Sequence, residues 1–320
     1  MTVEATSRAR LLRCSAVTQR LDSRPGATAG SFDSVLLVAR PLPWPRDVGD
    51  DPQLAPIVDA IHSGRAATGR TRLQAIVPDD APELTLYRRP PGAFSEYARF
   101  EPEADARSAI DRALALVEGE PAQPATAEGA TDHDVVEILV CTHGRRDACC
   151  GSLGPAVHRQ LTDIYAGSSD VRLVRRTSHL GGHRFAPTVA VMPSGTLWAW
   201  VDAELMQGIV EHTAPIEVAT RHYRGSMGLD LPEIQALDAA LLADHGWAWL
   251  ARARTASVLE RADGAALVQL DHTDGERRWT STATVNRARN SPIPTCGVAL
   301  DGTEKTQPEW TVGAISTRAA

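Results

Sequence analysis

The sequence predicts an α/β fold made of more than one structural unit. The chain has 320 residues, a length that suggests about two domains. Its composition, with 43% hydrophobic and 23% charged residues, is that of an ordinary globular protein. Two successive stretches repeat one order of short apolar runs and segments with helical periodicity. Strands that alternate with helices in this way are typical of α/β proteins.

The first stretch begins with a strand and contains two helices. Ser34–Arg40 (SVLLVAR) has an apolar interior, as buried strands do. A helix follows over Pro52–His62, with a proline near its start, where proline is tolerated. Two strands, Arg72–Val77 and Leu84–Arg88, flank a turn rich in Pro and Asp. The apolar residues of Glu103–Val117 have helical spacing and predict the second helix.

The second stretch repeats this order after a gap. Residues 118–132 lack periodicity and are rich in Pro, Ala, Gly and Glu, so we interpret them as a linker. A strand, a helix, a strand, a hairpin and a helix follow. They cover Val135–Cys141, Leu153–Tyr165, Val171–Arg175, the pair Thr188–Met192 and Thr196–Val201, and Leu205–His212.

These orders, β-α-β-β-α and β-α-β-β-β-α, are compatible with thioredoxin-like sheets flanked by helices. We therefore expect one thioredoxin-like unit over residues 1–117, a second over 133–230, and a small α+β extension over 231–320. The extension contains a helix and an antiparallel meander. Its predicted segments are Pro232–Ala243, Val258–Glu260, Ala266–Asp271 and Arg278–Val285.

Composition and charge argue against several classes of protein. A net charge of −7 disfavours a general nucleic-acid binder. No apolar run approaches the roughly 20 residues of a membrane-spanning helix. The first 30 residues lack the apolar core of a secretory signal, so we expect a cytoplasmic protein. Five cysteines, three of them within residues 141–150, do not suit a secreted disulfide scaffold.

A candidate site follows the first strand of the second stretch, in the sequence CTHGRRDACC. Cys141 ends this strand, and Cys149 and Cys150 come just before the next helix. Strand-end loops are where α/β proteins usually place their sites. Arg145, Arg146 and the start of the helix can stabilise thiolates there. We therefore expect these thiols to have a ligand-binding or redox function.

Two histidines lie downstream, in SHLGGHRFAP. A Gly-Gly pair separates His179 from His183, which disfavours a helix and places both histidines on a loop. With Cys141 and Cys150 they form a candidate set of two thiolates and two imidazoles. Zinc accepts such a set in tetrahedral geometry. A [2Fe–2S] cluster accepts two Cys on one iron and two His on the other. The spacing alone leaves both possibilities open.

The paired motifs CTHGRRDACC and HLGGHRFA resemble those of the sucrase/ferredoxin-like family, also described as thioredoxin-like [2Fe–2S] proteins. The opening RCSAVTQRLDSRPGATAGSFDSVLLVARPLPWP is similar as well, so the resemblance spans roughly residues 13–202. It implies a [2Fe–2S] cluster held by Cys141, Cys150, His179 and His183. No pair of carboxylates suggests a glycosidase, so the word "sucrase" has no support in the sequence.

The resemblance also places the cluster in the unit 133–230 and leaves the unit 1–117 without one. The family's Arg-Asp pair falls on Arg146 and Asp147, which we expect to brace the loop. Cys149, beside Cys150, is an alternative second thiolate. We expect hydrogen-bonding, structural or core-packing roles for a further set of residues. These are His143, Cys14, Cys296, Trp198 and Trp200.

The implied function is one-electron transfer, and we expect a carrier that serves a reductase rather than a stand-alone enzyme. Imidazole ligands raise the potential of a cluster, and their free ring nitrogens can couple electron uptake to proton uptake. Residues 141–187 contain seven Arg and three Asp, a net charge of +4, which predicts a docking face for an acidic redox partner. Two alternatives stay open: a structural zinc-binding interaction module, and a thiol–disulfide redox protein, which the absence of C-x-x-C disfavours.

Overall fold

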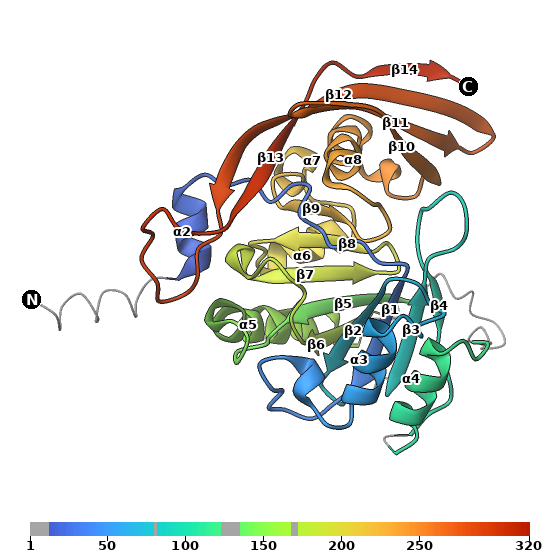
Figure 1. Cartoon of the computed structure of the whole chain (residues 1–320), viewed down its shortest axis with the longest axis vertical. Coiled ribbons are helices and arrows are strands. Elements are labelled where there is room, and N and C mark those ends of the chain that lie inside the picture. Colours follow the sequence, from blue (N-terminus) through green and yellow to red (C-terminus); the bar gives the residue numbers. More distant parts are fainter. Residues whose placement is uncertain (1–12, 80–81, 106, 123–134, 168–171) are drawn as a thin grey trace, which may run out of the picture.

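The computed structural model describes residues 13–79, 82–105, 107–122, 135–167 and 172–320. Within them, a mixed sheet of nine strands forms the centre of the molecule (Figure 1), in the order β4-β3-β1-β2-β6-β5-β7-β8-β9. A second, antiparallel sheet of five strands lies at the C-terminal end. None of the described helices is both long and apolar enough to cross a membrane.

The first unit contains the strands and helices predicted for it and, in addition, η1 and β4. Its elements are β1 (Ser34–Ala39), η1 (Val48–Asp50), α3 (Ala55–His62), β2 (Thr71–Ile76), β3 (Leu84–Arg88), β4 (Ala98–Phe100) and α4 (Ala109–Val117). β1 is parallel to β2 and antiparallel to β3, and every residue of β1 is buried. α4 begins later than predicted because the Asp105 carboxylate accepts the N–H groups of Arg107 and Ser108 in a local turn.

The second unit repeats this arrangement. Its elements are β5 (Val136–Cys141), α5 (Ala148–Tyr165), β6 (Arg172–Thr177), η2 (His183–Phe185), β7 (Thr188–Met192), β8 (Thr196–Ala199) and α6 (Ala203–Val210). β5 is parallel to β6 and antiparallel to β7, which pairs with β8 as the predicted hairpin. Both units therefore have the thioredoxin-like order, a parallel βαβ pair extended by an antiparallel hairpin, and the predicted fold class is confirmed.

The two units meet at their edge strands. Ile76 of β2 pairs with Thr177 of β6 in antiparallel register, which joins four strands on one side and five on the other into the nine-stranded sheet. The N–H of Val77 also donates to the carbonyl of Arg176, at 3.0 Å. Most of the predicted linker, residues 123–132, lies outside the described residues, and the predicted domain limits stay predictions.

The C-terminal region extends the central sheet and then covers it. β9 (Tyr223–Ser226) pairs with β8. The remaining elements are α7 (Ile216–Ala219), α8 (Pro232–His245), η3 (Gly246–Trp249), β10 (Arg254–Ala262), β11 (Ala265–Asp274), β12 (Arg277–Pro292), β13 (Thr306–Val312) and β14 (Ser316–Ala319). The predicted helix and meander are confirmed, while β13 and β14 are additional. Figure 1 shows the β12–β13 arm reaching across to α2 (Cys14–Arg20).

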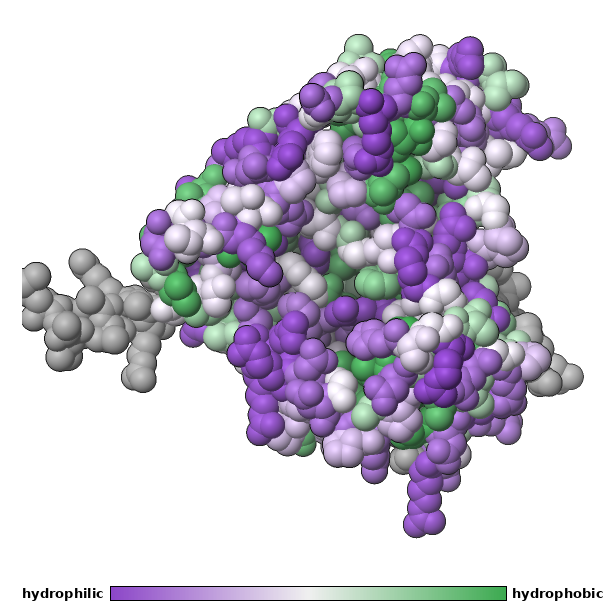
Figure 2. Space-filling view, viewed as in Figure 1, coloured by the Kyte–Doolittle hydropathy of each residue, from purple (hydrophilic) through white to green (hydrophobic). Residues whose placement is uncertain are grey.

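Trp198 and Trp200 pack against other aromatic side chains, and hydrophilic residues lie on the surface. Trp198 is fully buried, as predicted, and its ring lies 5.1 Å from that of Tyr223. Trp200 packs edge-on against Phe185, with ring centroids 5.1 Å apart. Hydrophilic residues predominate on the face shown in Figure 2.

Candidate metal centre

The loop between β5 and α5 is organised by the carboxylate of Asp147. Its Oδ1 atom accepts the N–H groups of Cys149 at 2.8 Å and Cys150 at 3.1 Å, which makes Asp147 the N-cap of α5. The helix therefore begins at Ala148, five residues before the predicted start at Leu153. Both cysteines lie in its first turn, where successive side chains point about 100° apart. They consequently face different neighbours.

Cys150 faces Cys141. The two buried thiols are hydrogen-bonded, and the ring of His179 makes a further hydrogen bond to Cys141. The bond from Cys150 lowers the pKa of Cys141 well below its usual range, with help from the N–H groups of His143 and Leu180. The same bond, together with burial, raises the pKa of Cys150. Of the two thiols, Cys141 is therefore the one that ionises more readily.

The first unit supports the loop that carries the histidines. The N–H of Ser178 donates to the carbonyl of Ala75 at 2.8 Å, and its hydroxyl donates to Gln74 at 2.8 Å. Arg72 and Gln74 both donate to the carbonyl of His179. The side chains that hold His179 in place thus come from β2, outside its own unit.

Gly182 is required by a buried arginine, whereas Gly181 is favoured by its positive φ of +80°. Arg224, on β9, is 2% exposed and donates to the carbonyl of Gly181 at 3.1 Å. Gly182 has a φ of +64°, and a Cβ there would lie 2.4 Å from the Arg224 guanidinium. Any larger residue would displace this arginine from beneath the loop.

His183 is held by Asp147. Its Nδ1 atom lies 2.9 Å from Asp147 Oδ2 and 3.3 Å from the sulfur of Cys14. The rings of His179 and His183 are 6.2 Å apart, and Nδ1 of His179 is buried with no hydrogen-bond partner among the described residues. Of the four predicted ligands, Cys141, Cys150 and His179 are thus in contact, and His183 lies next to His179.

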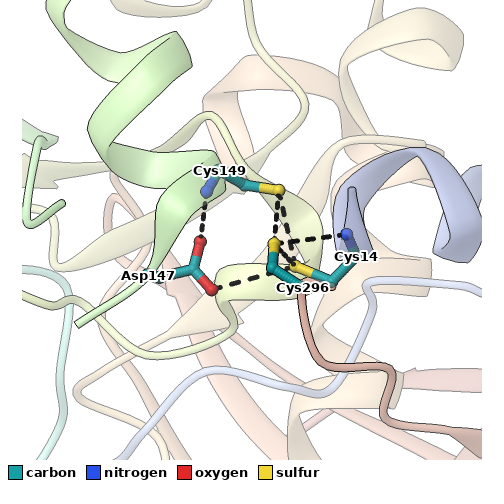
Figure 3. Close-up of side chains that lie close together, drawn as sticks. All are labelled: Cys14, Asp147, Cys149 and Cys296. Atoms are coloured by element: carbon teal, nitrogen blue, oxygen red, sulfur yellow. Dashed lines mark hydrogen bonds between the residues drawn. The ribbon is translucent and has the colours of Figure 1, made fainter. Parts of the chain in front are cut away.

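Cys149 faces two cysteines that the sequence does not connect with the site (Figure 3). Its sulfur lies 3.5 Å from that of Cys14 and 3.1 Å from that of Cys296, and the latter two are 3.3 Å apart. Asp147 completes this group, in which all ligand atoms lie within 4.8 Å of one another. Cys14 and Cys296, for which we expected structural roles, therefore meet Cys149 in one group. Spacing carries no signal across the 282 positions that separate them.

The remaining loop residues brace the site, as predicted. Arg146 forms an ion pair with Asp47 at 3.2 Å. His143 is buried against Trp44, and its Nε2 lies 2.7 Å from the carbonyl of Pro45. Burial lowers the pKa of His143, which favours the neutral ring. A hollow of about 100 Å³ opens beside these residues. Its lining includes Arg46, Arg72, Arg146, His143 and His179.

Comparison with known proteins identifies the family. A family model described as sucrase/ferredoxin-like matches residues 26–225, which include both sheet units and the CTHGRRDACC and HLGGHRFA motifs. The chain belongs to the sucrase/ferredoxin-like family. The resemblance predicted from these motifs is therefore confirmed, while Cys14 and Cys296 lie outside the matched region of this family member.

Two curated relatives share part of the chain. Altered inheritance of mitochondria protein 32 from Meyerozyma guilliermondii is 37% identical over 95 residues, or 28% of this chain and 33% of the relative. The protein of that name from Clavispora lusitaniae is 31% identical over 110 residues, or 28% of this chain and 39% of the relative. The chain thus spans between a third and two fifths of the length of these relatives.

Solved structures with partial likeness include a thioredoxin-like [2Fe–2S] ferredoxin from Aquifex aeolicus. It is 18% identical, covers 29% of this chain and 93% of its own, and has a TM-score of 0.25. A second structure, of the wild-type form at 1.5 Å, covers 28% of this chain and 96% of its own at a TM-score of 0.24.

Proposed function

We propose that this protein is a one-electron carrier whose [2Fe–2S] cluster is held by Cys141, Cys150, His179 and His183. The observation that carries the proposal is the meeting of Cys141, Cys150 and His179, with His183 next to them. Two thiols and two imidazoles are the donor set of one thiolate-bound and one imidazole-bound iron. When bound, such a cluster supplies reversible one-electron chemistry.

The side chains fit these roles. Cys141 already has the character of a thiolate, and backbone N–H groups stabilise its charge. Nδ1 of the half-exposed His179 is itself buried and has no hydrogen-bond partner among the described residues. Asp147 engages Nδ1 of His183, and a carboxylate on one ring nitrogen is the usual partner of a histidine that ligates metal through the other.

Two arginine side chains near Cys141 add positive charge to the site. The guanidinium groups of Arg72 and Arg224 interact electrostatically with Cys141, and Arg224 is buried while Arg72 is half-buried. Reduction adds one negative charge, and nearby positive charge in a medium of low dielectric favours that step. We infer that these arginines raise the midpoint potential of the carrier.

The exposed side of the site suits a protein partner. The cysteines are buried, whereas His179 and His183 are partly exposed, so electrons would enter through the imidazoles. Arg46, Arg145 and Arg146 are exposed around them. We propose that an acidic redox protein docks here and that the carrier serves a reductase. Free cysteines suit a reducing compartment, for which the cytoplasm is our proposal.

The decisive experiment is a visible spectrum with iron and acid-labile sulfide analysis of anaerobically purified protein. About two irons and two sulfides per chain, with reversible bleaching by one electron, would support the proposal. Stoichiometric zinc at the Cys141–Cys150 pair without sulfide would instead favour an interaction module. A colourless protein that forms reversible disulfides would favour thiol–disulfide exchange.

A further inference from the structure

The second thiol group joins three segments that are far apart in the sequence. Cys14 begins α2, Cys149 lies in the first turn of α5, and Cys296 lies on the loop between β12 and β13. Figure 3 shows their sulfurs turned toward one another, with Asp147 beside them. The cluster proposed above leaves all three thiols unused, so this group requires its own explanation.

Backbone N–H groups donate to two of the three sulfurs, while the hydrogen bond with Cys149 raises the pKa of Cys14 and burial raises that of Cys296. The N–H of Cys14 donates to the sulfur of Cys296 at 3.4 Å, and the N–H of Ser15 donates to that of Cys149. Hydrogen bonding lowers the pKa of Cys149 to about 6, chiefly through Cys14. Oδ2 of Asp147 lies 3.8 Å from the sulfur of Cys14 and provides an oxygen donor.

We propose that Cys14, Cys149 and Cys296, with Asp147 as the fourth donor, form a second metal site that takes a thiophilic divalent ion, Zn²⁺. A tetrahedral site with Zn–S bonds of about 2.3 Å requires sulfurs roughly 3.8 Å apart. The observed separations of 3.1, 3.3 and 3.5 Å would therefore widen by about 0.3 to 0.7 Å on binding the ion. None of its four donors is a proposed ligand of the iron–sulfur cluster.

A disulfide explains the group less well. It would bring two sulfurs to about 2.05 Å and leave the third thiol buried without a role. Here the three separations are nearly equal, and all five cysteines are free. The charge of three thiolates and a carboxylate exceeds that of the ion. Buried Arg184, which interacts electrostatically with Cys14, offsets part of the excess.

A bound ion would link the N-terminal helix, the cluster unit and the C-terminal arm. It would also lie beside the proposed cluster, because Oδ2 of Asp147 contacts both Cys14 and His183. We therefore infer a structural metal that fixes the Asp147 carboxylate, which in turn orients His183.

Reciprocal serine variants of the full chain test this inference. We expect purified wild-type protein to contain about one zinc per chain by elemental analysis. Cys14→Ser and Cys296→Ser should lose this zinc while keeping the iron, sulfide and visible spectrum. Cys141→Ser, the matched control, should lose iron and keep zinc. Iron and zinc are counted separately, so failure of one proposal is distinguishable from failure of the other.

Cobalt binding provides a second readout. Co²⁺ titrated into chelator-treated Cys141→Ser protein should give the visible bands of a tetrahedral thiolate site. Adding Cys296→Ser should weaken this binding by at least about 100-fold, beyond the loss seen for groups that only support a ligand. Three results would overturn the inference: wild-type protein that binds neither zinc nor cobalt, zinc that survives both serine changes, or loss of iron in Cys14→Ser with zinc retained.

Discussion

His183 and Asp147 are joined at 2.9 Å, Nδ1 to Oδ2, while the other oxygen of the same carboxylate caps α5. One side chain therefore fixes the position of a proposed ligand on the histidine loop and the first helical turn that carries Cys149 and Cys150. Carboxylates in this position orient an imidazole and set its tautomer. Asp147 thus ties the two halves of the site together, although it need not touch the cluster.

Asp147→Asn should impair cluster retention without unfolding the protein. The asparagine oxygen can still cap the helix, but the charged partner of His183 is lost. We expect cluster loss to chelator to accelerate by about 10- to 100-fold, the usual effect of removing a carboxylate behind a metal-bound histidine. The decay of visible absorption measures this rate. Asp202→Asn, which alters the N-cap of α6 away from the site, is the matched control. Equal rates in both variants would contradict the role of Asp147.

Cys150→Ser and Cys149→Ser should have opposite outcomes, because the two thiols face different groups. Cys150 contacts Cys141, so its replacement should abolish normal cluster assembly. Cys149 contacts Cys14 and Cys296, so its replacement should leave the visible spectrum nearly unchanged. Iron content per folded chain provides the comparison. If iron followed Cys149 instead, the second thiolate ligand would have to be reassigned.

Removing a cation near Cys141 should lower the midpoint potential. Arg72→Gln can keep a hydrogen bond to the His179 carbonyl while losing the positive charge near Cys141. We expect a decrease of roughly 60 mV, a tenfold change for one electron. Arg65→Gln, in an exposed ion pair with Glu118, should leave the potential unchanged. Voltammetry measures the midpoint potentials of both variants, and equal potentials would rule out an electrostatic contribution from Arg72.

Proton coupling should depend more on His179 than on His183. Reduction makes a metal-bound imidazole hold its remaining proton more tightly, so the midpoint potential should fall as pH rises, by up to about 59 mV per pH unit. Asp147 already holds Nδ1 of His183, whereas Nδ1 of His179 has no described partner. Film voltammetry of His179→Cys should therefore show the greater loss of slope. A wild-type potential that does not vary with pH would remove both histidines from the cluster.

The C-terminal sheet should lose stability in mild acid through His272. Burial, followed by the charge of Arg252, lowers the pKa of this histidine to about 4, below the 6.5 of an unfolded chain. The unfolded state then binds more protons than the folded state between these values. The free energy of unfolding should fall by about 2 kcal/mol as pH drops from 6.5 to 4. His272→Gln should remove this part of the pH dependence in denaturant titrations, whereas exposed His62→Gln should retain it.

The parts of the fold predicted from sequence are those coded locally. β1 contains a continuous apolar run, β5 contains one that follows Glu137, and the hairpin has its turn residues in place. β9, with the sequence YRGS, has no strand signal, because its burial depends on bonds from Arg224 to Thr28 and Gly181 in distant segments. Only the tertiary fold brings these groups together.

The site likewise has residues that local sequence patterns predict and contacts that only the tertiary fold creates. The spacing of Cys141, Cys150, His179 and His183 within one unit was enough to nominate them, and the loop-bracing role of Asp147 follows from its position before a helix. The contact of Asp147 with His183 depends on how two loops meet. The approach of Cys14 and Cys296 to Cys149 depends on an arm that begins in the C-terminal sheet, and no local pattern encodes it.

The edge-to-edge pairing of β2 and β6 makes the second unit, which carries the proposed ligands, dependent on contacts from the first unit. Gln74 and Arg72 donate hydrogen bonds to the carbonyl of His179, so the first unit holds the histidine loop of the second unit in place. A fragment cut at the linker would expose the unpaired edge of β6 and free the histidine loop at once. The half that contains the proposed ligands is therefore not expected to function when separated from the first unit. Grafting the motifs onto a single thioredoxin-like scaffold would transfer the proposed ligands without the residues of the first unit that position them.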